Sequence, residues 1–227
     1  MVSRQYKHLD TITALFVAIL MISNVAASKI TSFGPFSFDA ATILFPLTYI
    51  FGDILTEVYG YARSRKVIWL GIAANILLAI TLMVVTKLPP AADWPLQESF
   101  QAILGQTPRI VLASILAFFA GEFANSFVLA KLKVKTTGKF LWLRTIGSTL
   151  IGEGIDTVVF VLAAFWGVFP NSLVCTMIAS NYIFKVGLET LFTPVTYCIV
   201  GWLKRVESED YYDRDTNFNP FSTKNSG

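Results

Sequence analysis

The sequence predicts an all-α, polytopic integral membrane protein: a bundle of six transmembrane helices with both termini on the cytoplasmic side. The prediction rests on the apolar composition, its arrangement in long blocks, and the distribution of positive charge. Of the 227 residues, 54% are hydrophobic and only 15% are charged, and the mean hydropathy is +0.60. Soluble domains are closer to half apolar and a quarter charged, so the arrangement in blocks matters more than the totals.

Six apolar blocks are long enough to cross a bilayer, whose hydrocarbon core of about 30 Å needs about 20 helical residues. Because lipid offers the backbone no hydrogen-bond partners, blocks of this kind must be helices. They cover roughly residues 10–29, 42–60, 67–86, 109–130, 144–167 and 173–203. The first block has features of a signal peptide ending near Ala27. Its length and its polar residues Ser23 and Asn24 favour an uncleaved first helix.

Positive charges mark every second connection, and short loops rich in Lys and Arg stay in the cytoplasm. The cytoplasmic set is Arg4, Lys7, Arg63, Arg65, Lys66, Lys131, Lys133, Lys135, Lys139, Arg144, Lys204 and Arg205. The opposite connections carry only Lys29, Lys87 and Arg109. We therefore expect one membrane domain over residues 1–205 and a polar cytoplasmic tail over 206–227, the tail being mostly unstructured.

Metal and cofactor chemistry is disfavoured by the scarcity of ligands. The only histidine is His8, and the two cysteines, Cys175 and Cys198, lie on one predicted helix. At about 1.5 Å per residue they are roughly 35 Å apart, too far for a disulfide. Zinc or haem sites need several His or Cys ligands, so we expect no metal and no cofactor. The sequence also lacks a Gly-x-x-x-x-Gly-Lys-Ser/Thr motif for binding ATP phosphates.

Ionisable residues inside the apolar blocks are the main functional signal. They are Asp53, Glu57, Glu122, Glu153, Asp156, Lys185 and Glu189. A charge at the centre of a membrane helix costs about 2.5–3.5 kcal/mol, whereas interhelical hydrogen bonds stabilise by about 0.6 kcal/mol on average. Hydrogen bonds between helices would therefore not offset the cost of burying these charges, which argues against a purely structural role. Their helical spacing places neighbouring members on shared faces, which favours a site lined by polar groups.

Four of the polar residues lie at a common depth. Asp53, Asn75, Glu122 and Glu153 are each about nine residues from the cytoplasmic charges of their own block. At about 1.5 Å per residue that is roughly 13 Å, close to the middle of the bilayer. The sequence thus predicts a central binding site for a small polar solute. Glu57, nearer the cytoplasm, could instead pair with Arg63 or Arg65.

A longer pattern resembles a known family. The second block reads Phe45-Pro46-Leu47-Thr48-Tyr49, then Asp53, then Thr56-Glu57-Val58-Tyr59-Gly60-Tyr61 and Arg63. Further matches are Ser23-Asn24, Arg144 with Ser148-Thr149, Asp156-Thr157, Lys185, Glu189 and Pro194. Over about residues 20–200 the chain resembles the queuosine precursor transporter family, formerly described as a vitamin uptake family. The resemblance implies import across the inner membrane of 7-cyano- and 7-aminomethyl-7-deazaguanine for tRNA modification.

The residues and the resemblance together give a set of candidate substrate-binding residues: Asn24, Tyr49, Asp53, Glu57, Asn75, Glu122, Glu153, Asp156, Lys185 and Glu189. A guanine-like edge presents adjacent N–H donors that match the two oxygens of a carboxylate. Lys185 is expected to pair with Glu189 or with a carboxylate of another helix, and the Lys185–Glu189 pair could relay a proton. The expected partners are a deazapurine and the lipid bilayer, with no nucleic acid. A homodimer is compatible with a bundle of this size.

Two alternatives stay open. The chain could be the substrate-binding subunit of a vitamin-type importer that needs a separate energising module. It could also be an intramembrane acid–base enzyme, because paired carboxylates serve that chemistry too. The Gly-x-Gly-Asp setting of an intramembrane aspartyl protease is not matched by Phe51-Gly52-Asp53, so we expect no enzyme and no catalytic residues.

Overall fold

The computed structural model describes residues 6–26, 29–33, 36–105, 108–167 and 170–222, and it is mainly helical. The elements in chain order are α1 (Leu9–Ala26), β1 (Ile30–Phe33), β2 (Phe36–Asp39), the 3-10 helix η1 (Ala40–Ile43), α2 (Phe45–Tyr59), α3 (Tyr61–Lys87), α4 (Gln97–Leu104), α5 (Pro108–Lys135), α6 (Leu141–Phe165) and α7 (Asn171–Glu207). Six of the α-helices coincide with the six predicted blocks, and α4 lies in the connection between α3 and α5.

Five helices in the described parts of the chain are long and apolar enough to cross a membrane: α1, α3, α5, α6 and α7. The second predicted block differs, because α2 has only 15 residues and begins at Phe45 rather than near residue 42. Pro46, within the first two positions of α2, is well suited to a helix start because its fixed φ suits the first turn. The residues just before α2 form η1 instead of extending the helix.

The all-α prediction left out one short hairpin. Strands β1 and β2 pair antiparallel, with Ile30 opposite Asp39 and Phe33 opposite Phe36. Apolar and polar residues alternate in Phe36–Asp39, which is the period of a strand, but four residues are too few to stand out between two long apolar blocks.

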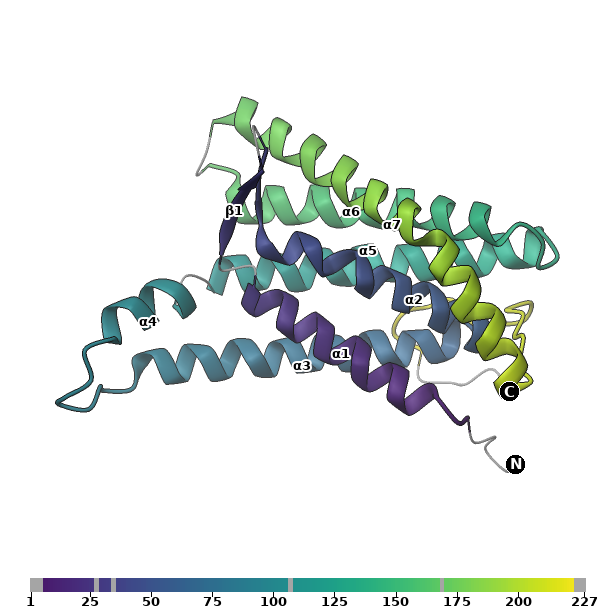
Figure 1. Ribbon diagram of the computed structural model, residues 1–227, viewed down its shortest axis with the longest axis horizontal. Coiled ribbons are helices and arrows are strands. Elements are labelled where there is room, and N and C mark those ends of the chain that lie inside the picture. Colours follow the sequence, from purple (N-terminus) through teal and green to yellow (C-terminus); the bar gives the residue numbers. More distant parts are fainter. Residues whose placement is uncertain (1–5, 27–28, 34–35, 106–107, 168–169, 223–227) are drawn as a thin grey trace.

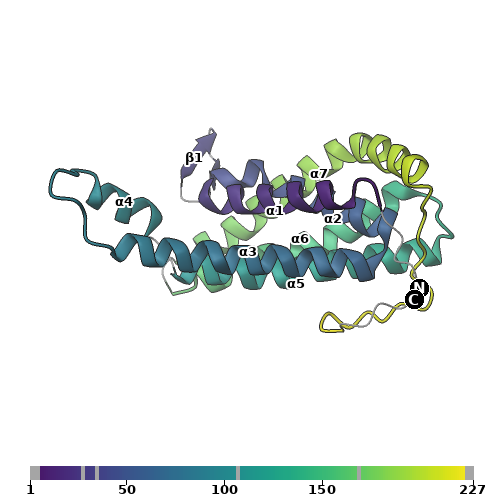
Figure 2. The same cartoon turned by 90° about the horizontal axis from the view of Figure 1, so that it is seen from below.

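The helices run back and forth along one long direction (Figure 1). The start of α1, the end of α7, the α2–α3 junction and the α5–α6 turn lie together at one end of the bundle. The hairpin and α4 lie toward the other end (Figures 1 and 2). The connections predicted to be basic are therefore gathered at the same end.

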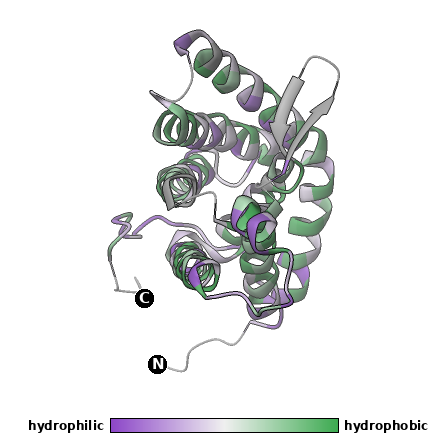
Figure 3. Ribbon diagram, turned by 90° about the vertical axis from the view of Figure 1, so that its left-hand side faces the viewer, coloured by the Kyte–Doolittle hydropathy of each residue, from purple (hydrophilic) through white to green (hydrophobic). Residues whose placement is uncertain are grey.

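The polarity of the bundle is inverted relative to a water-soluble protein. On α3, Leu77 is 65% exposed and Ile80 is 55% exposed, while Asp53 and Glu122 are at most 1% exposed. Many large apolar residues of the helices are exposed, and in the ribbon coloured by hydropathy green predominates on the helices while purple is frequent in the connections and the tail (Figure 3). An apolar exterior around buried charges is what lipid requires. The chain is a multi-pass membrane protein.

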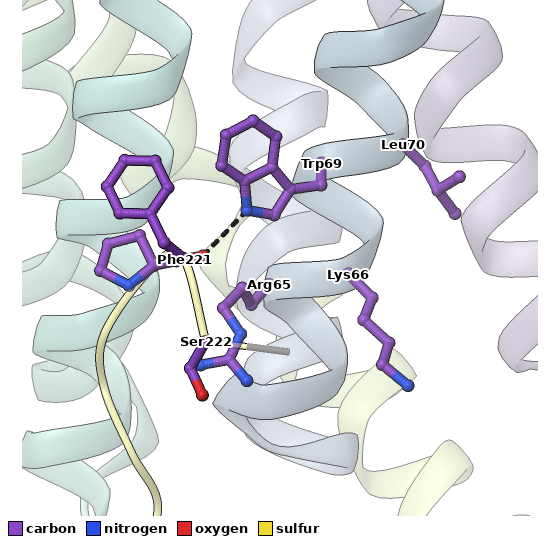
Figure 4. A pocket seen from close by; sticks show the side chains of 7 residues that line it. Arg65, Lys66, Trp69, Leu70, Phe221 and Ser222 are labelled. Atoms are coloured by element: carbon purple, nitrogen blue, oxygen red, sulfur yellow. Dashed lines mark hydrogen bonds between the residues drawn. The ribbon is translucent and has the colours of Figure 1, made fainter. Parts of the chain in front are cut away.

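The C-terminal tail is ordered over residues 208–222, contrary to the expectation of a mostly unstructured segment. Both carboxylate oxygens of Asp213 accept hydrogen bonds from the backbone N–H of Tyr61, at 3.1 and 3.0 Å, which caps the start of α3. Further along α3, Arg65 and Trp69 donate hydrogen bonds to backbone carbonyls of the tail. In the close view, Trp69 donates to the carbonyl of Pro220 beside a surface pocket that Phe221 helps to line (Figure 4).

Two turn glycines make room for the tail. At Gly60, φ is +86°, and a Cβ there would lie 2.2 Å from the ring of Tyr211. At Gly138, φ is +77°, and a Cβ would lie 2.0 Å from the hydroxyl of Tyr212. Residues with side chains are disfavoured at both positions by backbone conformation and by space. Tyr211 therefore packs on the turn that joins α2 to α3, and Tyr212 packs on the turn that joins α5 to α6.

Asp210 fastens the tail to the helices. Its carboxylate accepts a hydrogen bond from Lys133 of α5 and lies 2.9 Å from the Nζ atom of Lys204 of α7. Partial burial alone would raise the pKa of Asp210, yet hydrogen bonds from the two lysines hold that pKa below its ordinary value. A depressed pKa in the folded state means that this stabilisation is complete above about pH 4 and is lost as the pH falls through the folded-state pKa.

We expect Asp210→Ala to loosen the tail. An ion pair this exposed stabilises by about 0.2–1 kcal/mol, so trypsin should cut after Arg214 up to about fivefold faster than in the wild type, as followed by mass spectrometry. The control is Asp93→Ala, which removes an exposed carboxylate from the α3–α4 connection and leaves the residues around Arg214 unchanged. Equal cleavage rates in the two variants would show that Asp210 does not hold the tail.

Candidate functional site

The middle of the bundle holds a buried group of polar side chains from four helices, which we call the central polar cluster. Its members are Tyr49 and Asp53 of α2, Glu122 and Asn125 of α5, Thr149, Glu153 and Asp156 of α6, and Lys185 and Glu189 of α7. None of them is more than 7% exposed. On each helix the members are three, four or seven residues apart, so they share the face that points into the bundle.

Glycines bring these helices close together. A Cβ at Gly121 of α5 would lie 2.5 Å from the Tyr49 hydroxyl and 2.9 Å from the carbonyl oxygen of Gly152 of α6. A Cβ at Gly152 would lie 2.7 Å from the Cβ of Asn125. Small residues at such crossings let helix backbones approach in a membrane. The polar side chains beside them are consequently forced into one small region.

Two contacts tie members of the cluster across helices. Asp53 accepts a hydrogen bond of 2.8 Å from the side-chain amide of Asn125, which joins α2 to α5. Glu189 accepts a hydrogen bond from the Thr149 hydroxyl, which joins α7 to α6. Each carboxylate is thus held by a neutral donor rather than by a cation.

Lys185 pairs with carboxylates of α6. Its Nζ atom donates to Asp156 at 2.7 Å and lies 3.2 Å from Glu153, a distance typical of an ion pair but without hydrogen-bond geometry. Of the two partners that the sequence left open, the one from another helix is found. The expected Lys185–Glu189 pair is wrong, because Lys185 faces α6 while Glu189 is held by Thr149 one turn further along α7.

Several buried polar atoms of the cluster lack a hydrogen-bond partner among the described residues. They are the Tyr49 hydroxyl, both carboxylate oxygens of Glu122, the Asn125 amide oxygen, both carboxylate oxygens of Glu153 and one oxygen of Glu189. Leaving one buried polar group unpaired costs about 1–3 kcal/mol. A concentration of such groups is expected where a ligand, a proton or water completes the arrangement. The cluster has the acceptors to bind a small polar molecule rich in N–H donors.

Glu57 belongs to a separate set of ion pairs, which we call the Glu57 network: Glu57, Lys133, Arg144, Lys204 and Asp210. Arg144 donates two hydrogen bonds to the Glu57 carboxylate, at 3.1 and 2.7 Å, and Lys204 donates one at 2.6 Å. Lys133 lies 3.6 Å from the same carboxylate and donates to the Glu57 carbonyl. The network lies at the end of the bundle where the tail packs.

The expected pairing of Glu57 with Arg63 or Arg65 is not the one found. Arg63 donates to the carbonyl of Tyr59, and Arg65 donates to carbonyls of the tail. In the sequence, Lys133 and Lys204 stood out only as charges that orient the chain, and Arg144 as one of those charges and as part of the family resemblance. The usable signal was Glu57 itself, because a buried carboxylate near a helix end requires a cation from a neighbouring helix.

The last two predicted site residues lie in a third group, between α1, α3 and α5. Asn24 donates to the side chain of Asn75 at 2.7 Å and accepts from the hydroxyl of Ser114 at 2.9 Å. Asn24 also donates to the carbonyl of Leu20 on its own helix. All three partners are neutral, and the group resembles an interhelical tie. The structure thus divides the predicted residues among the central polar cluster, the Glu57 network and this group.

Fold and site together define a multi-pass membrane protein with a buried, carboxylate-rich polar site. Comparison with known proteins is specific: the family model described as "Putative vitamin uptake transporter" matches residues 39–199. The chain belongs to this family. It is the family that the sequence motifs resemble, and its newer name is the queuosine precursor transporter family.

Two relatives carry that newer name. The chain is 29% identical over 156 residues to the "Probable queuosine precursor transporter" of Bacillus subtilis (strain 168), which covers 68% of each chain. It is 23% identical over 197 residues to the "Queuosine precursor transporter" of Escherichia coli (strain K12), which covers 84% of this chain and 85% of the relative. No solved structure matches the chain significantly.

We expect Gly121→Ala to destabilise the protein, since the new methyl group would clash with the Tyr49 hydroxyl and lie 2.7 Å from the Cβ of Asp156. Overpacking of this kind costs about 1–3 kcal/mol, which would lower the unfolding temperature in detergent. The control is Gly187→Ala on α7, where a Cβ meets nothing within 4 Å. If both variants melted like the wild type, the close crossing of α2, α5 and α6 would be refuted.

We expect Glu57→Gln to be severe, because it leaves Arg144 and Lys204 buried or partly buried without their shared anion. Removing one partner of a buried ion pair costs about 3–5 kcal/mol, measurable as a loss of unfolding free energy. Glu98→Gln on the exposed face of α4 is the control and should change stability by no more than about 0.5 kcal/mol. A mild effect at Glu57 would mean that the network does not hold this end of the bundle.

Proposed function

We propose that this chain imports the queuosine precursors 7-cyano-7-deazaguanine and 7-aminomethyl-7-deazaguanine across the inner membrane. Membership of the family and the names of the two relatives support the class of substrate. The observation that carries the site is the set of buried acceptors in the central polar cluster that have no hydrogen-bond partner among the described residues. Both precursors are planar and polar, and neither presents enough apolar surface to cross lipid unaided at a useful rate.

Recognition would rest on carboxylates. The guanine-like edge of the substrate carries adjacent N–H donors, which match the paired oxygens of one carboxylate. Glu153 offers two oxygens that accept no hydrogen bond, one of them 3.2 Å from the Nζ atom of Lys185, and Asp53 adds a second carboxylate, which accepts a hydrogen bond from Asn125. Lys185 and the Tyr49 hydroxyl are donors that can meet the carbonyl oxygen of the base. We assign the substrate to a position among these side chains.

The orientation follows from charge. We propose that the end holding the Glu57 network is cytoplasmic, because the basic connections gather there, and that both termini are therefore cytoplasmic. In this arrangement α2, preceded by η1, also crosses the membrane, which brings the five long apolar helices to six crossings. Positioned between the substrate and the cytoplasm, the Glu57 network would close the inner side of the path in the conformation described.

The test is direct binding of each precursor to the purified protein in lipid nanodiscs, with guanine as competitor. The variants are Asp53→Asn and Glu153→Gln, and the matched controls are Asp93→Asn and Glu98→Gln, which alter exposed residues outside the bundle. Loss of a hydrogen bond to a charged group costs about 1.5–3 kcal/mol, so affinity should fall about 10- to 100-fold in the cluster variants and stay unchanged in the controls.

The opposite outcome is equally clear. A well-folded wild type that binds neither precursor saturably would refute the proposed substrates. Substrate uptake into liposomes that contain this chain alone would separate a complete transporter from a binding subunit that needs an energising module. Binding without uptake would favour the binding subunit.

A further inference from the structure

Glu122 occupies an unusual position in the central polar cluster. Its side chain is 0% exposed, and neither carboxylate oxygen has a hydrogen-bond partner in the described parts of the chain. The carboxyl group lies directly against the backbone of α2, since a Cβ at Gly52 would be 1.9 Å from one oxygen and 2.9 Å from the Cδ atom. Gly52 therefore forms one wall of a tight slot around the Glu122 carboxyl group.

The ionisable groups around Glu122 are other acids. Asp53 of α2 and Glu153 and Asp156 of α6 act on it electrostatically, and it acts in turn on Tyr49 of α2 and Glu189 of α7. On α3, the buried polar residue Asn75 has its side-chain oxygen engaged by Asn24. Lys185 is directed to Asp156 and Glu153 instead. No cation faces Glu122 from the described residues of these helices.

The central polar cluster has too few cations to neutralise all of its carboxyl groups. The cluster has five carboxyl groups, Asp53, Glu122, Glu153, Asp156 and Glu189, and one lysine, so full ionisation would leave a net charge of −4 (1 − 5). An isolated buried charge is strongly disfavoured and a buried acid normally becomes neutral by keeping its proton. Among the five, Asp53 and Glu189 accept hydrogen bonds, and Asp156 and Glu153 lie beside Lys185. Glu122 has neither kind of partner.

We propose that Glu122 is a proton-binding site: its carboxyl group is protonated while α2 and α5 are packed together, and it releases the proton when they separate during transport. The only bond change is at oxygen, where an O–H bond forms with a proton taken from one side of the membrane and breaks to give that proton to water on the other. Coupling to substrate rests on the proposed function, whereas protonation of Glu122 does not.

A proton fits this slot better than a metal ion does. Metal ions bound by oxygen need several ligands arranged around them. In the described residues, no three Asp, Glu, His or Cys side chains converge closely enough to hold one. The contact with Gly52 also leaves no room for a hydrated cation on that side of the carboxyl group.

The first test is an infrared difference spectrum, wild type minus Glu122→Gln, on the protein in lipid nanodiscs at neutral pH. The carbonyl stretch of a protonated carboxyl group should be present in the wild type and lost in the variant. In the control, wild type minus Glu98→Gln, ionised carboxylate bands should be lost instead. Loss of carboxylate bands in the Glu122→Gln spectrum would overturn the proposal. If this variant does not fold, Glu122→Asp keeps the acid but shortens it, and the same carbonyl band should shift rather than vanish.

The second test measures coupling. Uptake of 7-cyano-7-deazaguanine, which carries no titrating amine, is compared in liposomes with and without a pH gradient that is acidic on the substrate side. The ratio of the two rates should exceed unity in the wild type and fall to unity in Glu122→Gln. A ratio of unity in the wild type would overturn the coupling. No uptake by the wild type would instead refute the proposed function, and the infrared result would still decide whether Glu122 holds a proton.

Discussion

The structure depends on one constraint: a bundle in lipid must neutralise every charge that it buries. At the end where the tail packs, each charged group of the Glu57 network lies beside a group of opposite charge. Glu57 and Asp210 are surrounded by Arg144, Lys133 and Lys204, and this network links α2, α5, α6, α7 and the tail. In the middle of the bundle the constraint is not met, because one lysine faces an excess of carboxyl groups. The paired charges of the Glu57 network stabilise the bundle, whereas the excess of carboxyl groups in the central polar cluster indicates a functional site.

Helix α2 connects the two regions. Asp53 and Glu57 lie one helical turn apart on it, so one residue contributes to the central polar cluster and the other to the Glu57 network. A movement of α2 against α5 would alter the slot of Glu122 at Gly52 and the ion pairs of Glu57 together. Because α2 is shared, substrate binding in the central polar cluster and opening or closing of the Glu57 network can change together.

Periodicity and composition predicted the long helices and the buried ionisable residues, since both follow from the cost of exposing polar groups to lipid. Contacts between distant segments could not be read in the same way. Lys185 had two equally plausible partners, and only the packing of α7 on α6 selects Asp156 and Glu153. Packing of the tail was not predicted because the segment is polar overall. Its aromatic residues Tyr211 and Tyr212 pack on two turns and Phe221 packs on α3, contacts that exist only in the folded protein.

Binding of substrate among the carboxylates of the central polar cluster can be checked with an experimental structure of the protein in lipid with 7-cyano-7-deazaguanine bound. We expect the base between α2, α5 and α6, with its N–H edge on Asp53 or Glu153. A base found against the Glu57 network, or in the surface pocket beside Trp69 and Phe221, would contradict this expectation and assign the central carboxyl groups to another task.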